Sequence, residues 1–300
     1  MTTRLLDIPQ GSPAWHEARR TRYGASELAP IGGIQTYQRA GEVWARKCGA
    51  PVEERQRDLW QRIGHALEPL ALELAAETLG SLTLRGAVLQ QADGMLLASL
   101  DAAVDASTPE PIDAKVRGKG SDDHAVYSRG AIPVSTMLQL LQQSALVAEL
   151  TGRWPEAAHV TAILADAWGW EHRTFRLALD AERRDYWRDL WAGYAPRWHR
   201  AYVLPRRPPP DATTADIGVL VEVGKVTQRE ATAEERGLLA ALVEAEAARR
   251  EADRIAREAT KARDLARDDL ARSLGTTAVV PGVRWASRRN LSPLLTLEKP

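Results

Sequence analysis

The stretch LLASLDAAVDASTPEPIDAKVR, residues 96–117, decides the fold. It contains two short apolar segments that carry charge: the first holds Asp101, and the second holds Asp113 and Lys115. Turn-forming residues separate them, which predicts two neighbouring strands of a hairpin. Because side chains alternate between the two faces of a strand, Asp113 and Lys115 share one face, and Asp101 can converge on it from the neighbouring strand.

Two carboxylates and an ammonium group on a sheet surface are suited to metal-dependent hydrolysis. Carboxylate oxygens bind divalent cations such as Mg²⁺, and the cation can poise a water for attack. An acid followed by (D/E)-x-K is the pattern of a large superfamily of metal-dependent nucleases, which this stretch resembles. The same residue types also occur by chance on solvated hairpins, so the remaining segments must discriminate between the two interpretations.

The composition indicates a globular protein that stays in the cytoplasm. Hydrophobic residues make up 44% of the 300 residues and charged residues 27%, and no apolar run approaches the roughly 18 residues of a membrane span. The N-terminus lacks a signal pattern, and the single Cys48 excludes an internal disulfide or a cysteine zinc site. Lys plus Arg equals Asp plus Glu at 40 each, so net charge gives no argument for nucleic acid.

A short helix and a glycine-flanked turn are predicted near the N-terminus. Trp15, Arg19 and Arg22 recur at helical spacing, and Ser26 follows Gly24 as a helix N-cap would. An arginine and a serine hydroxyl beside a helix N-terminus can cradle a phosphate. A capped helix with surface arginines is the alternative interpretation.

Helices are predicted over residues 37–48 and 53–79. Glu68 lies beside the apolar stripe of the second helix and matters chemically only if that helix packs against the Asp101 strand. The predicted stripe is Leu67, Leu70, Ala71 and Leu74.

After the hairpin, residues 116–133 predict a polar, glycine-rich loop over the site. A helix over residues 134–150 follows and places Gln139 and Gln143 one turn apart on one face. Two more strands and a helix, capped by Asp180 and buried through a Trp-rich stripe, complete this part of the chain. They are predicted over residues 159–166, 172–180 and 181–202.

The prolines of residues 205–231 predict a linker between residues 1–204 and residues 232–300. Residues 232–274 follow a nearly continuous helical pattern with a narrow alanine-rich stripe, so this helix needs a partner surface. The remaining tail predicts a small β element, and its arginines are either solvated or in contact with DNA phosphates.

Together these segments resemble the YqaJ-type viral recombinase family, relatives of phage lambda exonuclease in the PD-(D/E)xK nuclease superfamily. The family patterns are W-x3-R-x6-S, then G-x-x-x-E-P on a helix, then an aspartate two residues after Ala or Ser, and then E-x-K before a glutamine-bearing helix. The matching residues are Trp15, Arg19, Ser26, Gly64, Glu68, Pro69, Ser99, Asp101, Asp113 and Lys115.

The resemblance implies an α/β fold of the restriction-endonuclease-like class. Its core is a central mixed β-sheet flanked by helices, and the C-terminal long helix is an extension. Residues 1–204 would be the nuclease domain, residues 205–231 the linker, and residues 232–300 the long helix plus basic tail.

The resemblance also implies a Mg²⁺-dependent 5′-to-3′ exonuclease that degrades one strand of duplex DNA from its ends, with Mn²⁺ as a substitute metal. Asp101 and Asp113 would ligate the metal, helped by the carbonyl of Ala114 and by Glu68. Lys115 would orient or deprotonate the attacking water. The residues expected to steady the site are Gln139 or Gln143, and those expected to grip a 5′-phosphate are Arg19 and Ser26.

The implied setting is phage-type recombination in the bacterial host cytoplasm, beside a single-strand annealing protein, with the nuclease as a ring-shaped homo-oligomer encoded by a phage or prophage. Two departures from the family pattern stand out. Asp113 replaces the usual Glu, and an insertion of one helical turn leaves open which glutamine serves. The alternatives are a catalytically inactive DNA-end-binding scaffold and a structure-selective endonuclease of the same superfamily.

Overall fold

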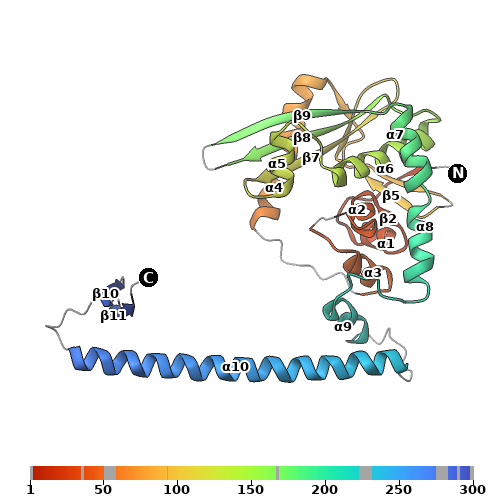
Figure 1. The fold of residues 1–300 in the computed structure, drawn as a ribbon. Coiled ribbons are helices and arrows are strands. Elements are labelled where there is room, and N and C mark those ends of the chain that lie inside the picture. Colours follow the sequence, from red (N-terminus) through yellow and green to blue (C-terminus); the bar gives the residue numbers. More distant parts are fainter. Residues whose placement is uncertain are drawn as a thin grey trace. The chain divides into compact units, whose positions relative to one another are not determined.

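The computed structural model describes residues 3–34, 37–50, 59–92, 94–166, 169–222, 232–274, 283–288 and 291–297. The chain forms two compact units, residues 1–227 and 228–300 (Figure 1). The strands of the first unit are β1 (Thr3–Leu6), β2 (Tyr23–Gly24), β3 (Leu82–Thr83), β4 (Val88–Gln91), β5 (Leu96–Ser99), β6 (Ala102–Val104), β7 (Glu110–Gly118), β8 (Ala157–Ala165) and β9 (Trp170–Ala178). Its α-helices are α1 (Pro13–Thr21), α2 (Leu28–Ile31), α3 (Ala40–Lys47), α4 (Leu59–Leu79), α5 (Asp122–Ser128), α6 (Val134–Thr151), α7 (Ala181–Tyr186), α8 (Tyr194–Trp198) and α9 (Thr214–Glu222).

The first unit contains two mixed sheets, ordered β3-β6-β7-β8-β9 and β1-β4-β5-β2. In the larger sheet β6 and β7 pair antiparallel, which confirms the predicted hairpin, and β7 then runs parallel to β8. The first predicted strand of the hairpin is divided: β5 belongs to the smaller sheet and β6 to the larger one. Asp101 lies at this division, between the two sheets.

Helices cover both faces of the larger sheet, which is why β8 (AAHVTAILA) is buried along its whole length and lacks polar alternation. On one face α4 packs with Ala71 and Ala75 against Ile112 and Ile163. On the other face lies α6, which also contacts β1, β4 and β5 of the smaller sheet. The α/β class and the mixed sheet flanked by helices are therefore confirmed, and the structure adds a second mixed sheet.

The helix predicted over residues 134–150 is α6, and it ends where the sequence indicates. Gly152 takes the left-handed conformation with φ of 77°, and its amide donates to the carbonyl of Ala148 at 2.8 Å. Glycine suits this position because it has no Cβ to clash in the left-handed region. The fully buried side chains of α6 include Leu138, Leu140 and Leu141, so α6 is the central helix of the core.

Three sequence predictions are wrong in detail. Leu70 is 44% exposed, because α4 turns Ala71, Leu72 and Ala75 toward the sheet. The small side chains of Ala71 and Ala75 let the helix approach closely, and the Ala71 carbonyl accepts a hydrogen bond from Thr161 Oγ1 at 2.9 Å. The predicted loop over residues 116–133 contains the end of β7 and the short helix α5, which Ser121 caps. The helix after Asp180 is interrupted by π-helical turns, which leave Leu190 52% exposed.

Part of the predicted linker is structured. Within residues 205–231 the structure describes α9, whose Leu220 is buried. The Asp216 carboxylate accepts hydrogen bonds from Arg39 Nη1 at 2.9 Å and from the Thr213 amide at 2.7 Å. The chain past the prolines thus remains attached to the first unit as far as α9. Residues 223–231 lie outside the described residues.

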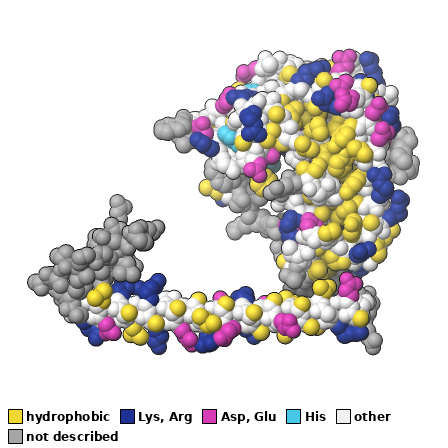
Figure 2. Space-filling view, in the orientation of Figure 1, with side chains coloured by type: hydrophobic (Ala, Val, Ile, Leu, Met, Phe, Trp, Pro, Cys, Tyr) yellow, Lys and Arg dark blue, Asp and Glu magenta, His cyan; other side chains and the backbone are white. Residues whose placement is uncertain are grey.

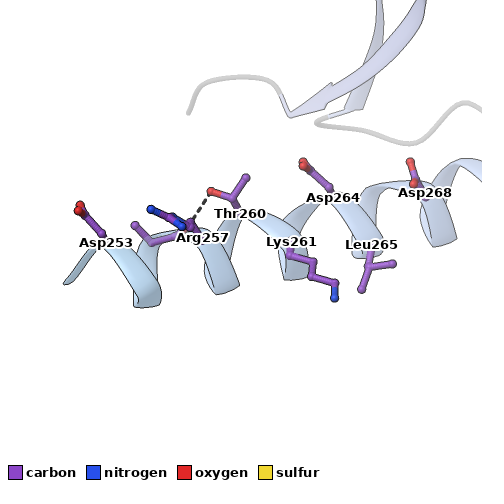
Figure 3. Close-up of a pocket in the computed structure, with 8 residues that line it drawn as sticks. Asp253, Arg257, Thr260, Lys261, Asp264, Leu265 and Asp268 are labelled. Atoms are coloured by element: carbon purple, nitrogen blue, oxygen red, sulfur yellow. Dashed lines mark hydrogen bonds between the residues drawn. The ribbon is translucent and has the colours of Figure 1, made fainter. Parts of the chain in front are cut away.

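The second unit consists of α10 (Ala233–Leu274) and a hairpin of β10 (Val283–Arg288) and β11 (Leu291–Leu297), as the sequence predicts. A reciprocal capping box starts α10: Thr232 Oγ1 accepts from the Glu235 amide at 3.2 Å, and Glu235 accepts from the Thr232 amide at 2.7 Å. A hollow of about 680 Å³ lies along α10, and all its lining residues belong to this helix (Figure 3). Of the described helices, none has the length and apolar character to cross a membrane.

The packing of α6 makes a prediction for stability. Leu140→Ala is expected to lower the free energy of unfolding by about 2–5 kcal/mol, because it leaves a cavity in a fully buried position. Leu190→Ala, at an exposed position, is expected to stay within about 0.5 kcal/mol of the parent chain. Urea unfolding followed by tryptophan fluorescence measures both changes. Equal losses for the two variants would contradict this assignment of the core.

Candidate active site

The site forms where β5 ends and the chain crosses into β6. Asp101 lies at this crossing, and its Oδ2 accepts a hydrogen bond of 2.7 Å from the amide of Ala114 on β7. Asp113 is the residue before Ala114, so the two aspartates converge from neighbouring strands. The expected convergence of Asp101 on the β7 face therefore occurs.

The side chains of Asp113 and Lys115 lie on the same face of β7, as their spacing predicts. Lys115 Nζ lies 2.5 Å from Asp113 Oδ2. The Asp113 side chain is almost entirely buried. A buried carboxylate without a positive partner would be strongly destabilising, so Lys115 also stabilises the fold here.

The structure brings Gln139, not Gln143, to the carboxylates. Gln139 Nε2 donates to Asp113 Oδ1 at 2.5 Å, and its Oε1 accepts from Lys115 Nζ at 3.4 Å. Gln143 lies one turn further along α6 and donates to the backbone carbonyl of Ser99 at 3.0 Å. Gln139 therefore holds the charged pair itself, while Gln143 supports the end of β5.

Glu68 lines the same cavity from α4. This cavity measures about 170 Å³, and Asp101, Asp113 and Lys115 also line it. Glu68 Oε2 is 3.1 Å from His65 Nδ1, so part of its carboxylate already has a partner. Within the described ranges, no three Asp, Glu, His or Cys side chains approach closely enough to form a complete metal-ligand set.

The burial and close approach of the two aspartate carboxylates favour a bound cation. Burial and the neighbouring Asp113 carboxylate, opposed by Lys115, together raise the pKa of Asp101 to about 7. Asp113 Oδ2 is buried and accepts no hydrogen bond from the described residues, although Lys115 is close. Two such oxygens fit Mg²⁺, which typically uses one or two carboxylates and keeps several waters.

The predicted phosphate-binding pair lies next to the carboxylates. Arg19 Nη2 is 3.4 Å from Ser26 Oγ, and both residues line the 170 Å³ cavity. The Arg19 guanidinium stacks 4.6 Å above the Trp15 ring, and Trp15 Nε1 donates to Ser99 Oγ at 2.8 Å. A stack of this kind fixes the direction of the guanidinium, so Arg19 can present its donors to the cavity.

Ser26 is not a helix N-cap, contrary to the sequence prediction. It lies inside a 3-10 turn, Ala25–Glu27, and the carboxylate of Glu27 caps the turn by accepting from the Gly24 amide at 2.8 Å. Gly24 is tightly packed: a Cβ at this position would lie 2.9 Å from Arg19 Nη2. The absence of a side chain at Gly24 therefore leaves room for the stacked guanidinium of Arg19.

Sequence reasoning missed a buried ion cluster behind this pair. Glu27 lies 3.2 Å from Arg19 Nη2 and 2.7 Å from Lys47 Nζ, and both Glu27 and Lys47 have 2% of their side chains exposed. Lys47 also donates to the carbonyls of Arg19 and Arg22, at 2.6 Å each. The spacing of Gly24 and Glu27 is a weak signal for a capped turn. No sequence pattern near Glu27 indicates that Lys47 is its ion-pair partner.

Three hollows meet at Ser26. Ser26 lines the 170 Å³ cavity, a hollow of about 430 Å³ beside α5 and another of about 540 Å³ beside α1. Lys115 and Gln139 also line the hollow beside α5, and Arg19 and Arg46 line the one beside α1. The carboxylates therefore lie between two larger openings, each of which is lined by cationic side chains.

This arrangement of Asp101, Asp113 and Lys115 is the one that the nuclease-like sequence pattern predicts. Residues 14–152 match the family model described as the YqaJ-like viral recombinase domain, and this range contains every residue of the site described above. Residues 14–152 are therefore similar to the YqaJ-like viral recombinase domain, in agreement with the sequence motifs.

Solved structures of similar shape include an alkaline exonuclease, LHK-Exo, from Laribacter hongkongensis. It is 16% identical with a TM-score of 0.47, over 65% of this chain and 97% of that chain. The structure of LHK-Exo in complex with dAMP gives 14% identity and a TM-score of 0.46, over 72% of this chain and 100% of that chain. The structure of SSO0001 gives 10% identity and a TM-score of 0.32, over 65% of this chain and 88% of that chain. No curated protein sequence matches this chain.

The Glu27 cluster makes a prediction for the pH dependence of stability. Burial alone would raise the pKa of Glu27, but Lys47, Arg19 and Arg46 outweigh it and lower this pKa from its ordinary 4.5 to about 2. The folded state therefore gains stability above pH 4.5 and loses it as the pH falls toward 2. At pH 7 Glu27→Gln is expected to cost about 3 kcal/mol of unfolding free energy.

Urea unfolding at several pH values checks this expectation. The difference between the parent chain and Glu27→Gln should shrink steadily as the pH falls below 4.5. Glu17→Gln is the matched control, because the side chain of Glu17 is 63% exposed. A difference for Glu27→Gln that does not change with pH would contradict the ionised state of the cluster.

Proposed function

We propose that this chain is a Mg²⁺-dependent 5′-to-3′ exonuclease that degrades one strand of duplex DNA from its ends. The observation that carries the proposal is the shared cavity of about 170 Å³, which two aspartates and Lys115 line together with Arg19 and Ser26. A hydrolytic centre and a phosphate-binding pair in one small cavity suit a DNA strand whose 5′ end lies in that cavity.

The metal ligands in this proposal are Asp101 and Asp113. The carbonyl of Ala114 and the carboxylate of Glu68 are the additional donors, and Mn²⁺ is the substitute for Mg²⁺. When bound, the cation supplies Lewis acidity at the scissile phosphate and lowers the pKa of a water. Aspartate in place of the usual glutamate at position 113 is one methylene shorter, and its carboxylate still lies in the cavity beside Asp101.

Lys115 and Gln139 act on the reacting groups around the metal. Lys115, whose Nζ lies 2.5 Å from Asp113, orients the attacking water or, as the neutral amine, deprotonates it, and its ammonium form offsets the charge that develops on the phosphate. Gln139 contacts both Asp113 and Lys115 through the two ends of its amide, so it fixes their relative position. Gln143 acts indirectly, because it donates a hydrogen bond to the Ser99 carbonyl at the end of β5.

Arg19 and Ser26 bind the 5′-phosphate. A guanidinium forms charge-assisted hydrogen bonds to phosphate oxygens, and the Ser26 hydroxyl adds a neutral donor. The stack on Trp15 and the ion pair with Glu27 hold Arg19 in place before DNA arrives. A grip on the terminal phosphate explains both the preference for ends and the 5′-to-3′ direction.

The biological setting we propose is phage-type recombination by single-strand annealing. The family of the domain is that of viral recombinases. A nuclease that exposes one strand from a duplex end requires a protein that covers this strand, so a single-strand annealing protein is the proposed partner. A ring-shaped homo-oligomer and action in the bacterial host cytoplasm, from a phage or prophage gene, belong to the same proposal.

A catalytically inactive DNA-end-binding scaffold is the second candidate, and the Asp113 substitution is the feature that favours it. A buried Asp113 that is held by Lys115 and Gln139 argues against it, because a binding site has no need of this desolvated charge. A structure-selective endonuclease of the same superfamily is the third candidate, and it would not require the grip on a terminal phosphate.

The first experiment uses linear duplex DNA with a 5′-phosphate at one end and a 5′-hydroxyl at the other, each strand labelled. With Mg²⁺, we expect mononucleotides from the 5′-phosphorylated strand alone, and no release for Asp113→Ala. Release that ignores the 5′ group would support the nuclease but contradict the phosphate grip. No release with Mg²⁺ or Mn²⁺ would favour the scaffold, and internal cuts in circular DNA would favour the endonuclease.

Two matched pairs of variants separate chemistry from grip. Lys115→Met is expected to lower the single-turnover rate by about 10²- to 10³-fold, because it removes the group that offsets the developing charge, whereas Lys119→Met should leave it unchanged. Arg19→Ala should weaken the discrimination between 5′-phosphate and 5′-hydroxyl ends, and Arg153→Ala should not. Equal rates for the two lysine variants would contradict the role of Lys115.

A further inference from the structure

Positive charge gathers around Glu27 in the first unit. Basic and acidic side chains are mixed over the face of this unit that Figure 2 shows, and the whole chain has 40 of each kind. A local surplus of positive charge is therefore a separate feature and not part of a general excess. It lies beside Arg19 and Ser26, the proposed phosphate-binding pair.

Three cations surround the single carboxylate of Glu27. Its Oε1 lies 3.2 Å from Arg19 Nη2 and 3.4 Å from Arg46 Nη2, and its Oε2 lies 2.7 Å from Lys47 Nζ. Within the described part of the chain, no other carboxylate forms an ion pair with these three cations. One carboxylate compensates one positive charge, so two positive charges remain.

Lys47 alone is enough to neutralise Glu27. Both side chains are 2% exposed, and the Lys47 ammonium uses its remaining donors on two backbone carbonyls. Burial, together with the charges of Arg19 and Arg46 and opposed by Glu27, lowers the pKa of Lys47 to about 8. Arg46 therefore brings a positive charge that the cluster does not need for its own stability.

Arg46, in the last turn of α3, faces the hollow of about 540 Å³ beside α1. It lines this hollow together with Arg19 and Ser26. The side chains of Arg46 and Arg19 are 35% and 22% exposed, so both guanidinium groups can reach a ligand. Arg19 and Ser26 also line the 170 Å³ cavity. A phosphate bound to this pair therefore lies at the boundary between the cavity and the hollow, and Arg46 faces it from the hollow.

A surplus of two positive charges matches a phosphate monoester better than a phosphate diester. A terminal phosphate carries close to two negative charges at pH 7, because its second pKa is about 6. Each internal phosphate of DNA carries only one. Guanidinium groups also donate parallel N–H bonds to phosphate oxygens, so two of them suit a group with three terminal oxygens.

We propose that Arg46 is a third phosphate-binding residue, which makes the site selective for the dianionic monoester at a 5′ end over groups that carry a single charge. This inference rests on the proposed function, because it concerns the same phosphate. Arg19 and Ser26 bind the phosphate from the cavity, and Arg46 binds it from the hollow. An internal phosphate leaves one positive charge uncompensated, so the site holds a strand by its end and not along its length.

The test compares the binding of the full chain to three hairpin duplexes, each with one open end, that differ only in their 5′ group. A 5′-phosphate carries two charges, a 5′-sulfate has the same terminal oxygens but one charge, and a 5′-hydroxyl has none. Fluorescence anisotropy without divalent metal gives the affinities, so the result does not depend on hydrolysis. The parent chain is expected to bind the phosphate end about tenfold more tightly than the sulfate end.

Arg46→Gln is expected to lower this phosphate-over-sulfate ratio to about two- to threefold, because it removes one of the two surplus charges. Arg20→Gln is the matched control and should keep the parent ratio. Arg20 lines the same hollow, but its side chain is 58% exposed and pairs with Glu17. Arg46→Lys keeps the positive charge and should stay close to the parent.

An unchanged ratio for Arg46→Gln, or an equal fall for Arg20→Gln or Arg46→Lys, would overturn the role of Arg46 and leave the proposed function in place. An equal loss of affinity for all three ends would show a purely structural role and overturn the inference as well. A parent chain that binds phosphate and hydroxyl ends alike would contradict the phosphate-binding pair and, with it, this inference. Circular dichroism and urea unfolding check that each variant keeps its fold.

Discussion

The hydrogen bond between the Ala114 amide and the Asp101 carboxylate is the contact on which the site depends. Asp101 stands where the chain leaves the smaller sheet and enters the larger one, so its position is not fixed by a continuous ladder of strand hydrogen bonds. The Ala114 amide fixes it from β7 instead and brings it beside Asp113. The backbone of β7 therefore holds the Asp101 carboxylate, and side chains hold that of Asp113: Lys115 on β7 and Gln139 on α6.

A second rigid group supports Arg19 and Ser26, the proposed phosphate-binding pair. Glu27 is buried, yet it contacts three cations and one backbone amide, so its charge is compensated from every side. Lys47 uses its three donors on Glu27 and on two carbonyls at the end of α1 and just beyond it. This cluster connects α1, the turn that carries Ser26, and α3. The fold thus pre-organises the proposed phosphate-binding pair.

The predictable parts of the structure follow from local sequence patterns, whereas the unpredictable parts depend on contacts between residues that are far apart in the sequence. The β6–β7 hairpin and the shared face of Asp113 and Lys115 follow from a local alternation of residues, as does α6 from its glycine stop. The choice between Gln139 and Gln143 does not, because one helical turn separates them and only the packing of α6 decides which faces Asp113. Lys47 meets Glu27 across an intervening helix and turn, and no local pattern records this contact.

The close packing of Gly24 against Arg19 has a consequence for sequence comparison. A side chain at this position would displace either the stacked guanidinium or the turn that carries Ser26. The arginine, the glycine, the serine and the glutamate thus form one unit in the sequence, R-x4-G-x-S-E, although the glutamate does not line the cavity. A chain that keeps the arginine and the serine but has a larger residue in place of the glycine would retain the letters of the motif without its geometry.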